Sequence, residues 1–166
     1  MTLTDEPTVE IRTTLNGESI SARVVLRQSV VDWVRHEAGL TGSHVGCEHG
    51  VCGACHVILD GKIVRGCLML AVQLDGADIV TIDASVPSKE VRALQGAFHD
   101  RAALQCGFCT PGMILQACEL LRENGAPSRS EIREAISGNY CRCTGYHAIV
   151  DAIENAAATL RGEQPA

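Results

Sequence analysis

Nine cysteines dominate the chemistry that is available to this chain of 166 residues. Thiolates at fixed spacing bind zinc or iron–sulfur clusters, and closely spaced thiol pairs can also exchange disulfides. Eight of the nine divide by spacing into two sets of four, which are Cys47, Cys52, Cys55 and Cys67, and Cys106, Cys109, Cys141 and Cys143. Cys118 belongs to neither set.

The first set has the spacing C-x4-C-x2-C with a fourth cysteine further on, which is typical of plant-type [2Fe–2S] ferredoxins. Three glycines of this loop, Gly46, Gly50 and Gly53, are predicted to permit unusual backbone angles and to bring amide N–H groups close to sulfur. Zinc is the alternative metal, but the regular spacing of the glycines argues against it. We therefore predict that the first set binds a [2Fe–2S] cluster.

The second set combines a C-x2-C pair with a C-x-C pair. This spacing alone fits zinc as well as iron, and a C-x2-C pair can also be a thiol redox centre. A thioredoxin-like centre would be expected in a βαβ context, whereas this pair opens a helical segment. Cys109 and Cys143 are each predicted to precede a helix start, where free N–H groups favour a thiolate. Beside a ferredoxin-type loop, we predict a second [2Fe–2S] cluster.

Other residues near the two sets have simpler interpretations. His49 lies inside the first loop, but that set already has four cysteines, so the imidazole is predicted to be solvated. Cys118 falls on the apolar face of a predicted helix and is expected to be a small buried hydrophobe. No functional role is assigned to His44, His56, His99 and His147.

Regular structure must position these loops, and the first half of the chain predicts a β-rich unit. Strands are expected at residues 9–15, 19–26, 55–59, 63–64 and 79–82. Asn16-Gly17 is a strong signal for a two-residue hairpin between the first two strands. Apolar residues at helical spacing from Val30 to Ala38 predict one short helix, which Gly39 ends.

The second half changes character and predicts four helices. The first follows Ser88, and Thr110 is a predicted N-cap with a proline after it. Ser128 and Glu131 form a predicted capping box for the third helix, and residues 148–160 form the fourth. With a boundary near Asp83 to Pro87, we predict an α+β protein with a ferredoxin-like [2Fe–2S] domain at residues 1–83 and a four-helix [2Fe–2S]-binding domain at residues 84–166.

Charge and composition argue against several classes of binding partner. The net charge of −6, without a run of Lys or Arg, argues against binding to nucleic acid or anionic lipid. No stretch approaches the roughly 20 apolar residues of a membrane span, and residues 1–7 lack the basic start and apolar run of a signal peptide. We therefore expect a cytoplasmic protein whose thiols stay reduced. The sequence also has no nucleophile–base constellation, GxGxxG loop or phosphate-binding motif, so no catalytic residue is predicted.

Three motifs in order, GCEHGVCGAC, QCGFCTPGM and GNYCRCTGY, make the chain resemble the small iron–sulfur subunit of the molybdenum hydroxylases. This is the family of xanthine dehydrogenase, aldehyde oxidase and aerobic carbon monoxide dehydrogenase. The resemblance covers roughly residues 8–160. Two residues depart from the family pattern. His56 stands where the family usually has Thr, and Tyr140 stands where it usually has Leu.

The resemblance implies a β-grasp ferredoxin domain followed by a four-helix-bundle cluster domain. It further implies docking to a large molybdopterin subunit, which would hold the substrate chemistry, and to a medium FAD subunit, in a dimer of heterotrimers. Electrons would pass through the second cluster, then the first, to FAD. Cys143, helped by Gln105, would contact the pterin. Two alternatives remain open, namely a free-standing ferredoxin-like shuttle and an iron–sulfur redox sensor.

Overall fold

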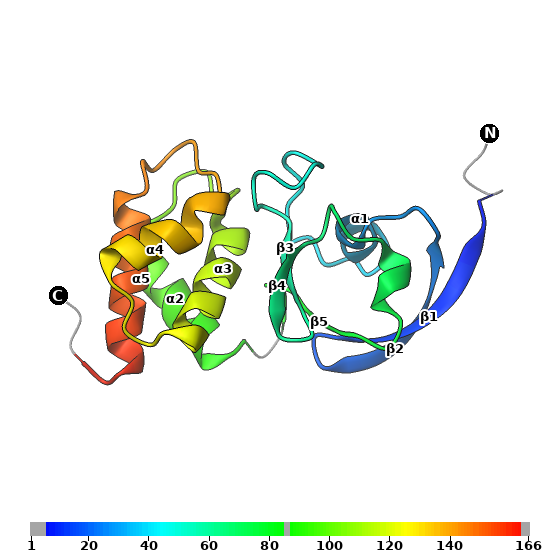
Figure 1. Ribbon diagram of the computed structural model, residues 1–166, viewed down its shortest axis with the longest axis horizontal. Helices are drawn as coiled ribbons and strands as arrows, with labels where there is room; N and C mark the ends of the chain where they lie inside the picture. The colour runs from blue at the N-terminus through cyan, green and yellow to red at the C-terminus, as the bar shows by residue number, and fades with distance from the viewer. Residues whose placement is uncertain (1–5, 85–86, 164–166) are drawn as a thin grey trace.

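The computed structural model describes residues 6–84 and 87–163, which form a β-rich half and a helical half (Figure 1). The first half contains strands β1 (Thr8–Leu15), β2 (Glu18–Val25), β3 (His56–Leu59), β4 (Lys62–Arg65) and β5 (Asp78–Val80), helix α1 (Val30–His36) and the 3-10 turn η2 (Ala71–Leu74). The second half contains helices α2 (Lys89–Asp100), α3 (Thr110–Glu123), α4 (Arg129–Ala135) and α5 (His147–Leu160), with the 3-10 turn η3 (Ile136–Gly138). The predicted α+β class is confirmed.

The strands form one mixed sheet in the order β2-β1-β5-β3-β4. Strand β1 pairs antiparallel with β2 and parallel with β5, and β3 pairs antiparallel with both β4 and β5. Asn16 and Gly17 have φ values of 53° and 89°, as a two-residue hairpin turn between right-twisted strands requires. Helix α1 packs Trp33 and Val34 into the same apolar core as Ile11 and Ile79. The loop that carries the first cysteine set therefore begins and ends in a firmly packed unit.

The helical half has its own apolar core, to which α2, α3, α4 and α5 all contribute. Ser88 caps α2 through its side chain, and the predicted capping box of Ser128 and Glu131 is present at the start of α4. The prediction of Thr110 as the N-cap of α3 is wrong, because Thr110 is the first helical residue and Cys109 is the cap. The Thr110 hydroxyl is buried and has no hydrogen-bond partner among the described residues.

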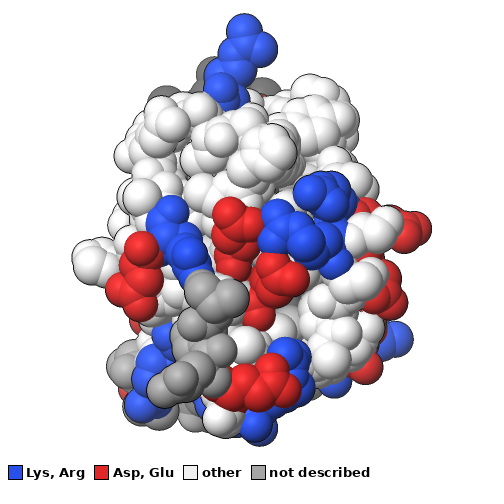
Figure 2. Space-filling view, turned by 90° about the vertical axis from the view of Figure 1, so that its left-hand side faces the viewer, with Lys and Arg blue, Asp and Glu red and all other residues white. Residues whose placement is uncertain are grey.

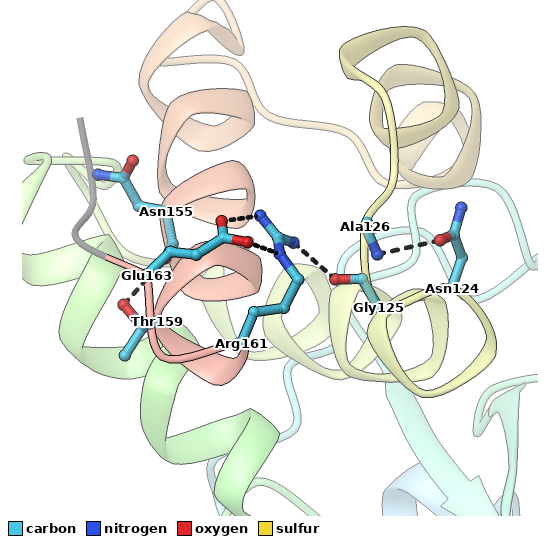
Figure 3. Close-up of polar contacts among 7 residues, drawn as sticks. All are labelled: Asn124, Gly125, Ala126, Asn155, Thr159, Arg161 and Glu163. Carbon is cyan, nitrogen blue, oxygen red and sulfur yellow. Dashed lines mark hydrogen bonds and ion pairs between the residues drawn. The ribbon is translucent and has the colours of Figure 1, made fainter.

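The end of α5 is fastened to the turn between α3 and α4 (Figure 3). The Arg161 guanidinium donates to the carbonyl oxygen of Gly125 at 2.8 Å and forms an ion pair with Glu163 at 2.6 Å. Nearby, the backbone N–H of Ala126 donates to the Asn124 side chain at 3.0 Å. These contacts close the end of the helical half that lies away from the cysteine loops.

The two halves pack through α3, which lies against β3 and β4. Ile58 of the sheet belongs to the apolar core of the helices, and the backbone N–H of Ile63 donates to the Glu119 carboxylate at 2.7 Å. The predicted boundary near Asp83 to Pro87 includes Ser85 and Val86, which lie outside the described residues. Within the described ranges, no helix is long and apolar enough to cross a membrane.

Candidate metal centres

The first cysteine set is gathered by the loop between α1 and β3, and Cys67 joins it from just beyond β4. The backbone N–H groups of Val51 and Cys52 point at Cys47 Sγ, with N···S distances of 3.3 and 3.4 Å. Such amides favour the charged thiolate over the thiol. Cys55 lies deepest and is 2% exposed. The cysteine sulfurs therefore lie on the inner side of the loop, and backbone N–H groups surround them.

The three loop glycines have different reasons to be glycine. Gly50 and Gly53 have φ values of +78° and +73°, as the sequence predicted, but Gly46 is not among the residues with positive φ. A Cβ at Gly46 would instead lie 3.0 Å from Cys52 Sγ. The expected unusual angle at Gly46 is therefore absent, and the room that it leaves for sulfur explains the residue.

In each set the thiols approach one another in two pairs. The side chains of Cys47 and Cys52 interact, as do those of Cys55 and Cys67. In the second set Cys109 interacts with Cys141, and Cys106 Sγ lies 3.5 Å from Cys143 Sγ. Among the described residues, no three His, Cys, Asp or Glu side chains are gathered tightly enough for a single metal ion. Four thiols arranged as two pairs fit a two-iron cluster, which has two iron atoms to share four cysteines.

Local electrostatics prepare some of these thiols for metal binding and not others. Burial opposes the ionisation of Cys47, but three backbone N–H groups of the loop outweigh it and lower the pKa of Cys47 to about 6. Burial raises the pKa of Cys55 and of Cys109 to about 12. Since the thiolate is the metal ligand, binding of iron must displace the protons of these two buried thiols.

The second set lies where the loops before α3 and α5 meet. Gln105 Nε2 donates to the carbonyl oxygen of Cys143 at 3.1 Å and so joins the two predicted pterin contacts. Cys106 and Cys143 are exposed, whereas Cys109 and Cys141 are half-buried. Cys109 directly precedes α3, but the expectation for Cys143 is wrong, because α5 begins at His147 with Tyr146 as its cap.

Tyr146 holds the C-x-C loop in shape. Its φ of 69° turns the chain sharply into α5. Its hydroxyl accepts from the backbone N–H of Cys141 at 2.8 Å and donates to the carbonyl oxygen of Asn139 at 3.1 Å. Cys141 is also 3.1 Å from the Thr144 hydroxyl. Cys141 is therefore held through both its backbone N–H and its sulfur.

The two sets are joined by direct contacts between their loops. The backbone N–H of Tyr140 donates to the carbonyl oxygen of Cys52 at 2.9 Å. His44 stacks on Phe108 with ring centroids 4.7 Å apart. His56, which follows Cys55, is 3% exposed, and burial lowers the pKa of this imidazole to about 4. Neither histidine was predicted to have a role, although the departure of His56 from the usual Thr was a signal.

The two remaining expectations concern His49 and Cys118. His49 is exposed and its ring contacts the carbonyl oxygen of Cys47, which agrees with a solvated loop residue. Cys118 is fully buried on α3, and the nearest polar partner of its sulfur is the Ser88 hydroxyl at 3.9 Å. The ninth cysteine therefore packs as a core residue.

Comparison with known proteins supports two cluster-binding domains. The model of the 2Fe-2S iron-sulfur cluster binding domain matches residues 13–79, and that of the [2Fe-2S] binding domain matches residues 81–154. The gamma subunit of caffeine dehydrogenase from Pseudomonas sp. (strain CBB1) is 49% identical over 90% of this chain and 91% of its own length. The nicotine 6-hydroxylase small subunit from Paenarthrobacter nicotinovorans is 47% identical over 89% of each protein. A chain of the crystal structure of quinoline 2-oxidoreductase from Pseudomonas putida 86 matches with a TM-score of 0.86 and 47% identity, over 94% of this chain and 98% of that one.

Proposed function

This chain belongs to the family of small iron–sulfur subunits of molybdenum hydroxylases, and we propose that it relays electrons from a molybdopterin site on a large subunit toward FAD on a medium subunit. As a subunit of an oxidoreductase, it needs no catalytic residue of its own. When bound, two [2Fe–2S] clusters supply reversible one-electron chemistry. The eight cysteines hold them, Cys47, Cys52, Cys55 and Cys67 in one set and Cys106, Cys109, Cys141 and Cys143 in the other.

The observation that carries this proposal is the hydrogen bond from Tyr140 N–H to the carbonyl oxygen of Cys52. Cys52 is a proposed ligand of the first cluster, and Tyr140 is bonded to Cys141, a proposed ligand of the second. One hydrogen bond of 2.9 Å and a short run of covalent bonds therefore connect the two sets. A chain built to pass electrons between two sites needs such a direct connection, whereas two independent structural metals would not.

The exposed pair of cysteines in the second set indicates where electrons enter the chain. Cys106 and Cys143 reach the surface beside Gln105, whereas their partners in the set lie further in. Charged side chains gather over the middle and lower parts of this end of the molecule. Its upper part, where the loop 139–146 lies, is mostly uncharged apart from a basic side chain that projects from the top (Figures 1 and 2). We place the large subunit on this upper part, with Cys143 and Gln105 as the pterin contacts.

The first set has an apolar rim of its own. Val51 and Leu68 are 39% and 62% exposed beside this loop, and Leu68 lies against Gly50. Apolar side chains exposed around a redox site favour coverage by another protein. We place the medium FAD subunit here, in an assembly that we expect to be a dimer of heterotrimers.

We further propose that residues 1–83 form a β-grasp ferredoxin domain and residues 84–166 a four-helix-bundle cluster domain. The mixed sheet crossed by α1 supports the first assignment, and the separate core shared by α2 to α5 supports the second. The high identity to named subunits over nearly their whole length favours a subunit over a free-standing shuttle or a redox sensor.

Native, anaerobic purification of the chain tests the proposed function. We expect copurification with a large molybdenum-containing polypeptide and with a flavin-containing one. The isolated chain, free of molybdenum and flavin, should accept and return electrons but oxidise no aldehyde or N-heterocycle. Steady turnover of such a substrate by the pure chain would contradict the relay.

A further inference from the structure

Asn139 is a buried polar residue at the contact between the two cysteine loops. It is 1% exposed and stands two residues before Cys141. Its side-chain Nδ2 lies 3.4 Å from the carbonyl oxygen of Gly53 and 3.3 Å from Nδ1 of His56. Gly53 lies between Cys52 and Cys55, so one amide group of the second loop reaches two residues of the first.

The backbone of Asn139 is anchored within its own loop. Its N–H donates to the carbonyl oxygen of Ile136 at 2.9 Å, and its carbonyl oxygen accepts from the Tyr146 hydroxyl, which also accepts from Cys141 N–H. The residue that follows, Tyr140, donates to Cys52. Asn139 is therefore fixed to the second loop by its main chain and to the first loop by its side chain.

The placement of this amide is not explained by hydrogen bonding alone. Asn139 Oδ1 is buried and has no partner among the described residues, so half of the amide gains nothing from burial. The fit around the other half is close, since a Cβ at Gly53 would lie 2.7 Å from Asn139 Nδ2. A residue held so tightly, with an unsatisfied oxygen, is better suited to spacing two loops than to stabilising either one.

We propose that Asn139 is a positioning residue that sets the separation between the two clusters by bridging Gly53 and His56 to the loop of Cys141. The inference rests on the proposed function, because it assigns the cysteines on either side of this contact to two clusters. Without the amide, the Tyr140–Cys52 hydrogen bond loses its neighbouring support, and the two loops can move apart.

The test uses the full chain with both clusters assembled and reduced. Two reduced [2Fe–2S] clusters each carry an unpaired spin, and the magnetic interaction between them falls with the cube of their separation. We expect Asn139→Ala to keep the spectrum of each cluster but to weaken the spin–spin splitting seen by EPR. Electron transfer between the clusters after flash reduction should slow severalfold, because electron tunnelling weakens steeply as the two clusters move apart.

Asn124→Ala is the control, because Asn124 is a half-buried asparagine of the helical half whose side chain accepts from the backbone N–H of Ala126 at the far end of α3 (Figure 3). It should leave the splitting unchanged. An unchanged splitting in Asn139→Ala would overturn the inference while leaving the relay intact. If Asn139→Ala loses a cluster, the smaller change Asn139→Ser takes its place in the comparison. Cluster loss in both variants would also overturn the inference, since the residue would then serve assembly and not spacing. A wild-type chain that cannot be reduced at both sites would instead refute the proposed function.

Discussion

A methyl group added at Gly112 would lie 2.2 Å from the carbonyl oxygen of Gly53, across the contact between the two halves. Both atoms belong to fixed backbone or its first side-chain carbon, so no flexible group can move aside. The two halves would have to separate by roughly 1 Å to restore ordinary contact. Gly112 is also buried in the first turn of α3, where alanine is otherwise the better helix former.

The cost of overpacking should exceed the gain in helix propensity. We expect Gly112→Ala to lower the free energy of unfolding by about 1–3 kcal/mol. The thermal midpoint of a chain of this size should fall by roughly 2–4 °C for each kcal/mol. Gly96→Ala is the control, because Gly96 lies exposed in α2 with nothing within 4 Å of an added Cβ. It should raise the stability by up to about 1 kcal/mol.

Thermal and urea unfolding of both variants, with both clusters assembled, provides the measurement. The informative result is that two chemically identical Gly→Ala substitutions, both in helices of the helical half, change the free energy of unfolding in opposite directions. If Gly112→Ala were as stable as the parent chain or as Gly96→Ala, the backbone contact between Gly112 and Gly53 would not exist as described.

Three further predictions concern the clusters themselves. Metal analysis of an anaerobic preparation should find about four iron and four acid-labile sulfide per chain. One zinc in place of two iron atoms would contradict the assignment of a [2Fe–2S] cluster to the second cysteine set. Cys118→Ser should keep both clusters with some loss of thermal stability, whereas Cys67→Ser should lose the ferredoxin-type visible and EPR signal. Loss of a cluster in Cys118→Ser would show that the ligands were wrongly assigned. In the assembled complex, magnetic coupling between Mo(V) and its nearest cluster should vanish in Cys143→Ser and Cys106→Ser but survive in Cys47→Ser, and the reverse pattern would put the first set beside molybdenum.

Features that depend on neighbours in sequence were predictable. The Asn16-Gly17 hairpin and the Ser128–Glu131 capping box follow from a few adjacent residues, and both are present. The prediction for Thr110 was wrong by one position, because Cys109, whose place is set by the cysteine loop, is the cap residue and Thr110 is already helical. Local propensity has no access to that constraint.

Features that depend on contact between the halves were not predictable from spacing. His44 and His56 had no assigned role, yet one stacks on Phe108 and the other is buried beside Asn139. Gly46 was expected to have an unusual backbone angle, but the reason for glycine is the nearby sulfur of Cys52. In each case the partner that explains the residue lies in another turn of the loop or in the other half of the chain.

The contact between the halves shows why residues without redox chemistry matter to an electron relay. Each cysteine loop is specified locally by its own spacing, so either could bind a cluster without the other. Their relative position depends instead on contacts between the halves, among them the close approach of the Gly53 and Gly112 backbones and the side chain of Asn139, which spans the gap. A side chain at either glycine would place a bulky group between the loops and lengthen the path through Tyr140 and its hydrogen bond. The proposed function therefore constrains Gly53, Gly112 and Asn139 as well as the ligands, although only Gly53 was singled out in the sequence, and then for its backbone angle and not for this contact.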